Sequence, residues 1–181
     1  MNIEAYVVVG DDDHYCDRNG RMPDSLKHET EWAFFQAGLD AADIVVLGRL
    51  SHEVTPNPKH RRRLILTRSV VQCVCADGHV YWNPTDAPLQ TALSLFPSPA
   101  RKLAVVGGQF VFDFFLRHAP GYSRFHLSQI EGVKVPAGRA VFSAVSSQRS
   151  AADVLRGAGY TTVHQQKLAS NVKVTSWAPS L

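Results

Sequence analysis

Three short segments, each following an apolar run, carry residue types that suit phosphate binding. They are Val105–Gly108 (VVGG), Gly48–Ser51 (GRLS) and Leu66–Ser69 (LTRS). Glycine lets a backbone approach a ligand closely, the N–H groups of a following helix attract an anion, and a guanidinium group binds phosphate. The three segments together predict a phosphate-binding rim, although each alone also fits an ordinary tight turn or a solvated arginine.

The apolar patterns around these segments predict alternating strands and helices. Predicted strands cover residues 3–9, 43–48, 64–67, 102–106 and 123–130, with short extended segments at 72–80 and 80–82 around Asp77-Gly78. Predicted helices cover residues 25–40, with Ser25 as its cap, 89–96 and 109–118. Residues 160–168 and 171–177 alternate like an antiparallel hairpin.

This order of elements predicts an α/β fold with three layers. It consists of a mostly parallel central sheet, helices on both of its faces and a C-terminal antiparallel hairpin, in one domain over residues 1–181. In open sheets of this kind, ligands bind beyond the carboxyl ends of the strands. The three glycine- and arginine-bearing segments are all expected at that edge.

Composition excludes several other classes of protein. The chain has 181 residues, 45% of them hydrophobic, and a net charge of +3, which argues against disorder and against a dedicated nucleic-acid binder. The basic run 59–63 contains no aromatic residue and is interpreted as a solvated loop. No apolar run approaches the ~20 residues that span a bilayer, and no signal peptide is recognisable. Cys16, Cys73 and Cys75 are expected as reduced thiols, so we expect a cytoplasmic protein without a membrane segment.

Other chemistries find no support in the spacing of the residues. His28, Glu29 and Glu31 lack the spacing of a helical metal site, so no metal is expected. The chain contains no G-x-S-x-G segment, and it lacks the G-x-G-x-x-G and G-x-x-x-x-G-K-[ST] motifs of common nucleotide loops. A nucleotide would therefore be bound by another architecture.

In sequence order, the segments resemble the dihydrofolate-reductase fold. They are most similar to the reductase domain of bacterial riboflavin biosynthesis, a 5-amino-6-(5-phosphoribosylamino)uracil reductase, and to its stand-alone relatives. The matching stretches are 31–35 (EWAFF), 42–53 (ADIVVLGRLSHE), 64–68 (LILTR), 105–112 (VVGGQFVF) and 125–130 (FHLSQI). The zinc motif of the deaminase half of the two-step riboflavin enzyme, H-x-E with P-C-x-x-C, is absent.

The resemblance implies NADPH as the hydride donor. It implies Gly48, Arg49 and Ser51 at the 2′-phosphate and pyrophosphate, and Thr67 and Arg68 at the adenosine end. It also implies that the pyrophosphate is cradled by Val106, Gly107, Gly108, Gln109 and Val111. Ala5 and Val7, on the first strand, would lie along the nicotinamide. On the substrate side it implies Glu31, Phe35 and Ser128, the last where folate enzymes carry a threonine.

Two acids are candidates for the proton donor. Glu31 falls, allowing one inserted residue, where the folate enzyme places its acid, and Asp24 stands where that enzyme has a tryptophan after the loop 19–23 (NGRMP). Apolar neighbours such as Trp32 and Phe35 would raise the pKa of Glu31 and favour proton donation. An acid in a first helical turn is also expected for dipole reasons alone. Both interpretations of Glu31 stay open.

The sequence thus predicts an NADPH-dependent reductase that transfers a hydride to a small heterocyclic or carbonyl/imine substrate. The loop 10–24 would act as a lid over that substrate. The alternatives are a non-catalytic nucleotide-binding relative of the fold and a true dihydrofolate reductase. The resemblance and the alternation ending in Val172, Val174 and Trp177, expected to be exposed, also predict a homodimer. No nucleic-acid or membrane partner is expected.

Overall fold

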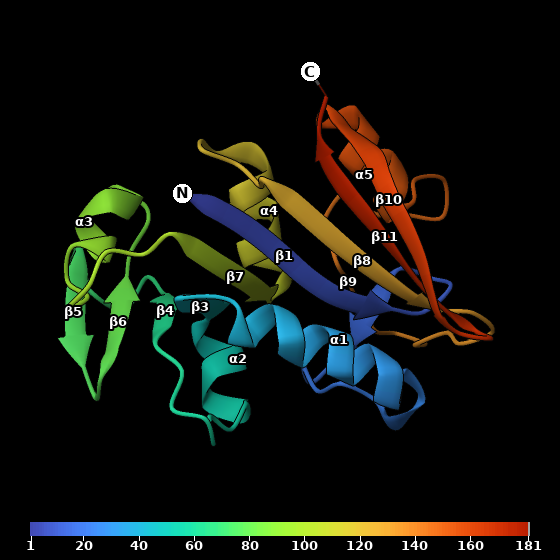
Figure 1. Cartoon of the computed structure of the whole chain (residues 1–181), viewed down its shortest axis with the longest axis horizontal. Coiled ribbons are helices and arrows are strands. Elements are labelled where there is room, and N and C mark those ends of the chain that lie inside the picture. The colour runs from blue at the N-terminus through green and yellow to red at the C-terminus, as the bar shows by residue number, and fades with distance from the viewer. Residues whose placement is uncertain (181) are drawn as a thin grey trace.

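The computed structural model describes residues 1–180, which form one nine-stranded sheet, a small two-stranded sheet and helices around them (Figure 1). The large sheet contains β1 (Asn2–Val9), β3 (Ile44–Gly48), β4 (Arg63–Leu66), β5 (Cys73–Ala76), β6 (His79–Trp82), β7 (Lys102–Gly107), β8 (Arg124–Ile130), β10 (Tyr160–Ala169) and β11 (Val172–Pro179). The small sheet pairs β2 (His14–Cys16) with β9 (Arg139–Ala140). The helices are α1 (Glu29–Asp40), α2 (Arg49–Val54), α3 (Leu89–Leu93), α4 (Gln109–Arg117) and α5 (Ala151–Gly157), with a 3₁₀ helix at Asp24–Leu26.

The strand order in the large sheet is β10-β11-β8-β1-β7-β3-β4-β6-β5. The central strands β8, β1, β7, β3, β4 and β6 are parallel to one another, whereas β5 and β11 run antiparallel to β6 and β8 and β10 returns along β11. The predicted α/β fold with a mostly parallel sheet and a C-terminal hairpin is therefore confirmed. Its parallel strands place the carboxyl ends of β3, β4 and β7 at one edge.

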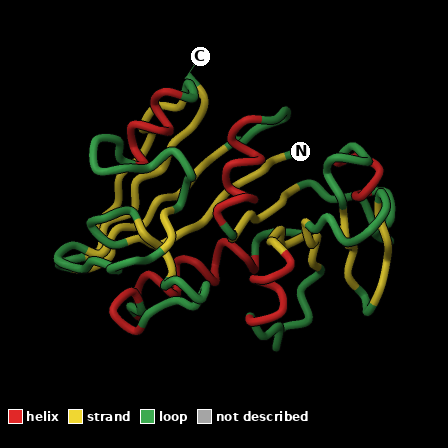
Figure 2. The backbone as a smooth tube through the Cα atoms, turned by 180° about the vertical axis from the view of Figure 1, so that it is seen from behind, coloured by secondary structure: helices red, strands yellow, loops and turns green. Residues whose placement is uncertain are grey.

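Helices cover both faces of the sheet, as predicted. Successive side chains of β1 alternate between the faces: Tyr6 packs with Leu39 of α1, whereas Ala5 and Val7 belong to the core that contains Phe112 of α4. Figure 1 shows α1 and α2 together along one side of the molecule, and Figure 2 shows α4 lying across the sheet from behind. Both faces are thus buried, which explains the nearly continuous apolar runs of the central strands.

The first helix begins four residues later than predicted. Asp24–Leu26 forms a separate 3₁₀ turn after Pro23, and the backbone is extended at Lys27 and His28 before α1 begins at Glu29. Ser25 therefore does not cap α1; that position belongs to His28, which makes no side-chain capping bond. The short helix 89–96 likewise ends earlier, at Leu93.

Two helices were not predicted. The segment after β3 forms α2, and α5 begins at Ser150, whose side chain and that of Asp153 complete a reciprocal capping box. The pattern Ser150-Ala-Ala-Asp153 contained this signal in the sequence. Among residues 1–180, no helix is long and apolar enough to cross a membrane.

The hairpin differs from the prediction in which side chains it exposes. Val172, Val174 and Trp177 are buried, because β11 lies between β8 and β10 and its two faces are covered. The exposed strand is β10, whose residues 161–167 are all accessible at the edge of the sheet. The interpretation of β11 as an exposed apolar strand was wrong, since strand order in the sheet decides which strand is the edge.

Arg63 also departs from the interpretation of residues 59–63 as a solvated loop. It is the first residue of β4 and is only 5% exposed. Its guanidinium is buried because it donates to the backbone carbonyl groups of Thr55 and Pro56 and to the His52 ring. The other four residues of the run precede β4 and are not buried.

Gly38 of α1 packs closely against Tyr6 of β1. A Cβ atom on Gly38 would lie 2.5 Å from the ring atom Cζ of Tyr6. That ring is fixed, because its hydroxyl donates to Glu4 Oε2 at 2.6 Å and the ring stacks on His126 at 4.7 Å. Only glycine at position 38 lets α1 pack this closely on the sheet.

We expect Gly38→Ala to lower the free energy of unfolding by about 1–3 kcal/mol, because overpacking outweighs the better helix propensity of alanine. The melting temperature should fall by about 2–4 °C for each kcal/mol. Gly157→Ala is the control, since the added Cβ would meet only the flexible end of Arg149. Equal melting temperatures of the two variants in thermal unfolding would contradict this packing constraint.

Candidate functional site

Two glycine-containing segments meet at the carboxyl ends of the adjacent strands β3 and β7. Gly48 precedes α2 and Gly108 precedes α4, each as the residue that caps the helix. A Cβ atom on Gly48 would lie 3.4 Å from Val111 Cγ2 and 3.7 Å from the backbone nitrogen of Gly108. The two segments therefore touch, and a larger residue at position 48 would fill the space between them.

The second segment has an unusual backbone. Gly107 has φ of +125°, a conformation that L side chains rarely adopt, and the peptide bond between Gly107 and Gly108 is cis. A Cβ atom on Gly108 would lie 3.7 Å from the Ser51 hydroxyl oxygen. Gly48, Ser51, Gly107, Gly108 and Val111 are thus brought together, although their binding of a cofactor stays a prediction.

Tyr15 is a member of this group that the sequence did not reveal. Its hydroxyl accepts a hydrogen bond of 3.0 Å from the backbone N–H of Gln109, in the first turn of α4. Burial raises the pKa of the Tyr15 phenol, so it is neutral at physiological pH. An aromatic residue in the polar segment 10–24 was the available signal, but only the fold shows that β2 brings it to α4.

The Gln109 side chain has a structural contact, and its predicted part in cofactor binding stays a prediction. Its side-chain Nε2 donates to the carbonyl oxygen of Ala140 at 2.8 Å, which links the first turn of α4 to β9. The Gln109 side chain therefore holds two loops together, and what it offers a ligand here is its backbone N–H, shared with Tyr15. Val106 is half-buried beside Leu47 and Phe35 on the face covered by α1.

The predicted arginines lie at the surface near this edge. Arg49 pairs with Glu53 one helical turn further on, at 2.6 Å between Nη1 and Oε1, and both side chains are about half exposed. Such exposed pairs contribute little, so the guanidinium can exchange its partner for a phosphate at little cost. Arg68 is exposed, and the neighbouring Thr67 hydroxyl lies 2.8 Å from that of Ser69.

Glu31 is a buried acid on the side of the sheet covered by α1. It is 4% exposed, and the side chain of Ser128, itself buried in β8, lies near its carboxyl group. Burial raises the pKa of Glu31 to about 7, although the nearby Ser128 acts in the opposite direction. The desolvation expected of Glu31 is therefore present, whereas its part in proton donation stays a prediction.

Asp24 has the opposite properties. Its carboxylate is almost fully exposed and lies 2.6 Å from Lys27 Nζ. The hydrogen bond from Lys27 lowers the pKa of Asp24, so this acid is ionised under all neutral conditions. A proton donor needs a pKa near the working pH, which favours Glu31 over Asp24.

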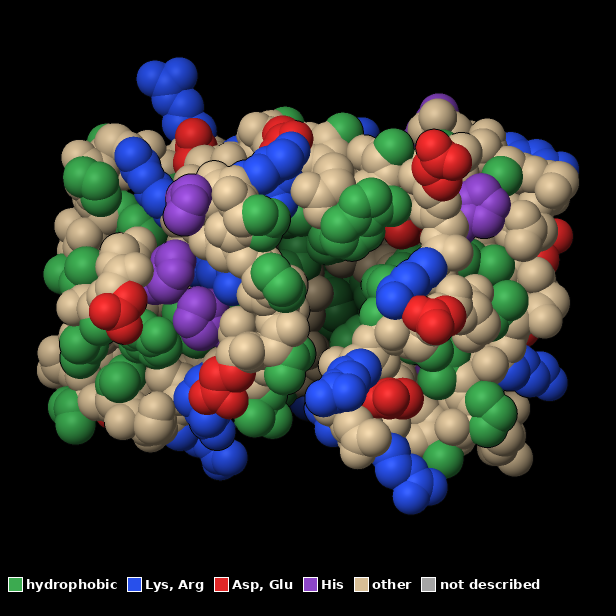
Figure 3. Space-filling view, turned by 90° about the horizontal axis from the view of Figure 1, so that it is seen from below, with side chains coloured by type: hydrophobic (Ala, Val, Ile, Leu, Met, Phe, Trp, Pro, Cys, Tyr) green, Lys and Arg blue, Asp and Glu red, His purple; other side chains and the backbone are tan. Residues whose placement is uncertain are grey.

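The remaining predicted residues have clear places. Ala5 and Val7 are buried in the core under α4, so their side chains serve packing and only their strand backbone is close to the edge. Phe35 stacks on Trp32 at 5.5 Å and packs against the apolar face under α1. Figure 3 shows a hollow bordered by hydrophobic side chains near the centre of the face on which α1 and α2 lie.

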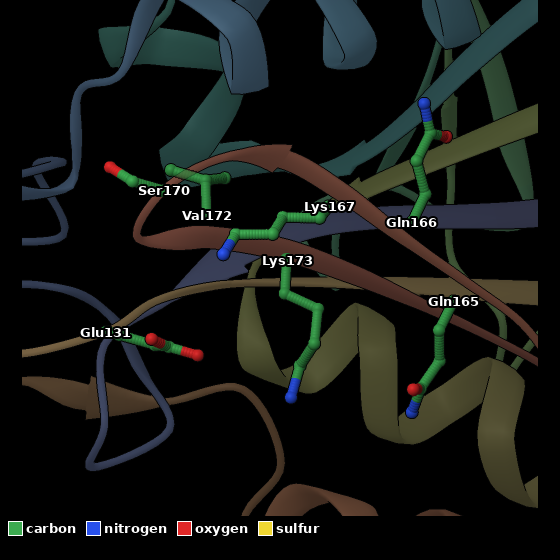
Figure 4. A pocket seen from close by; sticks show the side chains of 7 residues that line it. All are labelled: Glu131, Gln165, Gln166, Lys167, Ser170, Val172 and Lys173. Carbon is green, nitrogen blue, oxygen red and sulfur yellow. The ribbon is translucent and has the colours of Figure 1, made fainter.

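Another hollow, about 280 Å³ in volume, lies at the turn end of the C-terminal hairpin. Its lining side chains come from the end of β8 and from β10, β11 and their connection: Glu131, Gln165, Gln166, Lys167, Ser170, Val172 and Lys173. Figure 4 shows that they diverge: Lys173 and Gln165 point to one side of the hairpin and Gln166 points to the other. No chemical constellation forms there. Among residues 1–180, no three His, Cys, Asp or Glu side chains are grouped to hold a metal ion.

Comparisons with known proteins support the fold. No protein-family model matches the chain, and no curated protein matches it in sequence. Solved structures do match: a riboflavin biosynthesis protein from Shewanella sp. PV-4 superposes with a TM-score of 0.67 at 13% identity, covering 100% of both chains. A diaminohydroxyphosphoribosylaminopyrimidine deaminase/5-amino-6-(5-phosphoribosylamino)uracil reductase from Thermotoga maritima superposes with a TM-score of 0.66 at 14% identity.

The second match covers 99% of this chain but 56% of the Thermotoga protein, so the chain spans about half the length of that relative. Identities this low establish the architecture alone. The strand order, the paired glycine segments and these superpositions agree with one another. The chain therefore has the dihydrofolate-reductase-like fold of the riboflavin-biosynthesis reductases.

Proposed function

We propose that this protein is an NADPH-dependent reductase that transfers a hydride to a small heterocyclic or carbonyl/imine substrate. The observation that carries the proposal is a buried acid with a pKa near neutrality at the same end of the sheet as a glycine-lined helix N-terminus. The riboflavin-biosynthesis reductase among the structural matches supports it, because it shares this fold.

Sheet geometry relates the two parts of the proposed site. Ser128 lies opposite Val8 in β1, and on the other side of β1 Ala5 lies opposite Val105, two residues before Gly107. Two strand spacings separate β8 from β7, about 10 Å. In this proposal the nicotinamide and the substrate would lie over β1, between Glu31 and the glycines.

The glycine segments fit a dinucleotide. Gly48 and Gly108 keep open a space that Cβ atoms would fill, and α4 begins directly after Gly108, where the N–H of Gln109 is bonded to the Tyr15 hydroxyl. Ser51 and Arg49 on α2 would hold the phosphates of NADPH, with Thr67 and Arg68 toward its adenosine end. When bound, the reduced nicotinamide supplies the hydride.

Glu31 would supply the proton. Reduction of a C=N or C=O bond adds a hydride to carbon and a proton to nitrogen or oxygen. A carboxyl group with a pKa of about 7 is partly protonated at neutral pH and donates without a large energetic penalty. The Ser128 hydroxyl would orient that carboxyl, and Tyr15 would close over the cofactor with the segment 10–24.

The proposal is tested by adding NADPH or NADH and following the quenching of the three tryptophans. Loss of absorbance at the reduced-nicotinamide band is then recorded with a panel of heterocyclic, carbonyl and imine acceptors. Tight NADPH binding with turnover of at least one acceptor supports a reductase. Binding without turnover over the whole panel indicates a non-catalytic nucleotide-binding protein, and no binding refutes the proposal.

Arg49→Ala should weaken NADPH binding by about 10- to 100-fold and leave NADH binding nearly unchanged, because a guanidinium–phosphate bond contributes about 1.5–3 kcal/mol. Glu53→Gln should strengthen NADPH binding slightly, since it frees Arg49 from its ion pair. Arg124→Ala, which removes an exposed arginine at the start of β8, is the control. Equal losses for NADPH and NADH would exclude Arg49 from the 2′-phosphate.

Glu31→Gln should reduce turnover by about 10²–10⁴-fold while NADPH binding is retained. It should also change how stability depends on pH. The unfavourable ionisation of buried Glu31 is absent below pH 4.5, grows as the pH rises to about 7 and is complete above it. The wild type should therefore lose about 3 kcal/mol between pH 4.5 and 8 relative to this variant.

Urea unfolding across that pH range measures the second effect. Glu29→Gln is the matched control, because Glu29 is an exposed acid in the same helical turn. Wild-type turnover in Glu31→Gln would leave Glu31 without a part in proton transfer. If Glu31→Gln had the same pH dependence of stability as Glu29→Gln, Glu31 would be solvated in the wild type.

We also propose that the protein forms a homodimer. The two chains would pair through β10, an edge strand of the sheet, because β11 lies between β8 and β10. An edge strand of ten residues with accessible groups on residues 161–167 invites pairing with another chain. Light scattering at micromolar concentration should then give twice the chain mass of 20.0 kDa. A mass equal to one chain would contradict the dimer.

A further inference from the structure

The helix that carries Arg49 and Ser51 is weakly packed. α2 has only six residues and none of its side chains is buried. Its apolar residues Leu50 and Val54 are both mostly exposed. Burial of an apolar face normally holds a short helix in place, so the position of α2 depends on polar contacts.

Those contacts come from Arg63 at the start of β4. Its Nη1 donates to the His52 ring nitrogen Nδ1 and to the carbonyl oxygen of Thr55, each at 3.0 Å, and its Nη2 donates to the carbonyl oxygen of Pro56 at 2.9 Å. One guanidinium thus ties the last turn of α2 and the two residues after it to the sheet. Among residues 1–180, no carboxylate pairs with this buried cation.

The bond from Arg63 to His52 requires a neutral His52 ring with one tautomer. A ring nitrogen that accepts a hydrogen bond from Arg63 carries no proton, so the proton of His52 resides on Nε2. Nε2 in turn faces the Tyr81 hydroxyl at 3.4 Å. Protonation of Nδ1 would replace the Arg63–His52 hydrogen bond by two adjacent positive charges.

The groups around His52 reinforce this preference. Arg63 faces it from β4, and His79 and Tyr81 face it from β6, with the His79 ring 5.1 Å away and Asp77 in the turn beyond. On α2 itself, Glu53 is the one neighbour that favours the cationic ring. Burial and the charge of Arg63 lower the pKa of His52, and the same two causes lower that of His79.

We propose that the neutral ring of His52, held by Arg63, is the element that positions α2, and that protonation of His52 releases α2 from the sheet. His52 and Arg63 would then be positioning residues for Arg49 and Ser51. Their effect on cofactor affinity rests on the proposed function, whereas their effect on α2 does not.

The direction of the pH effect follows from linkage. Above about pH 6.5 the ring is neutral whether α2 is attached or released, so attachment is fully stable. As the pH falls below 6.5, the released state takes up a proton more readily than the attached state, because the pKa of His52 is lower when α2 is attached. Attachment of α2 therefore weakens progressively on the acid side of pH 6.5.

Hydrogen exchange of the intact protein tests this directly. The protection of amides in residues 49–56, corrected for the intrinsic effect of pH on exchange, is compared at pH 8 and pH 5. The wild type should lose at least tenfold protection at pH 5. His52→Asn should not, because the Asn Oδ1 atom can accept from Arg63 in place of Nδ1 and does not titrate. His164→Asn, which alters an exposed histidine of β10, should behave like the wild type.

Equal protection of the wild type at both pH values would overturn the proposal, as would an unchanged pH effect in His52→Asn. If His79→Gln lost the pH effect while His52→Asn kept it, the response would belong to His79, and the proposal would also be overturned. A nitrogen NMR titration of the wild type provides a test without any variant. His52 should show the proton on Nε2 and a pKa below 6.5, and a proton on Nδ1 or a pKa of 6.5 or above would refute the mechanism.

Affinity for NADP⁺ at pH 8 and pH 5 separates this proposal from the proposed function. The 2′-phosphate of the ligand titrates near pH 6 in every variant, so the informative quantity is the difference between wild type and His52→Asn. A pH-dependent release of α2 with at least a fivefold greater loss of NADP⁺ affinity in the wild type supports both proposals. Release of α2 without any binding of NADP⁺ supports the positioning role and refutes the cofactor.

Discussion

The contact between the ends of β3 and β7 is the constraint on which the proposed site depends. Gly48 and Gly108 lie so close that a side chain on Gly48 would meet Val111 and approach the backbone of Gly108. Because both glycines also precede helices, the same contact brings α2 and α4 together at one edge of the sheet. Glycine therefore leaves the backbone open at this point, next to Ser51 and the start of α4.

A second constraint acts on the other side of β1, where α1 covers the sheet. The approach of α1 is close because Gly38 leaves room for Tyr6, and this closeness buries Glu31 against Ser128. An acid that is expected to be ionised when exposed thus acquires a pKa of about 7. The packing of α1 on the sheet thus favours the protonated form of this carboxyl group, because it buries Glu31.

The arrangement of α2 shows how a basic residue can act without touching a ligand. Arg49 is exposed and exchanges partners easily, whereas Arg63 is buried and its bonds go to backbone carbonyls and to His52. A buried cation without a carboxylate is tolerated because three acceptors bind three of its five N–H groups. The proposals accordingly give the two arginines different roles, Arg49 in binding phosphate and Arg63 in positioning α2.

By itself, the sequence determined the order and type of most elements. The apolar runs of the parallel strands and the glycines after β3 and β7 are local signals, so the α/β fold, the shared edge and the two glycine segments were predictable. The shift of the first helix to Glu29 and the presence of α2 and α5 depended on weaker local signals at turns and caps. Boundaries of this kind are set by competing conformations of similar energy.

Only the tertiary structure decided which side chains are buried and which residues meet. Strand order made β10 the edge and buried Val172, Val174 and Trp177, and β2 carried Tyr15 to the first turn of α4. The burial of Arg63 needed α2 and the residues after it to fold back over β4. Burial and pKa depend on contacts between residues far apart in the chain, and no local pattern specifies those contacts before the sheet has assembled.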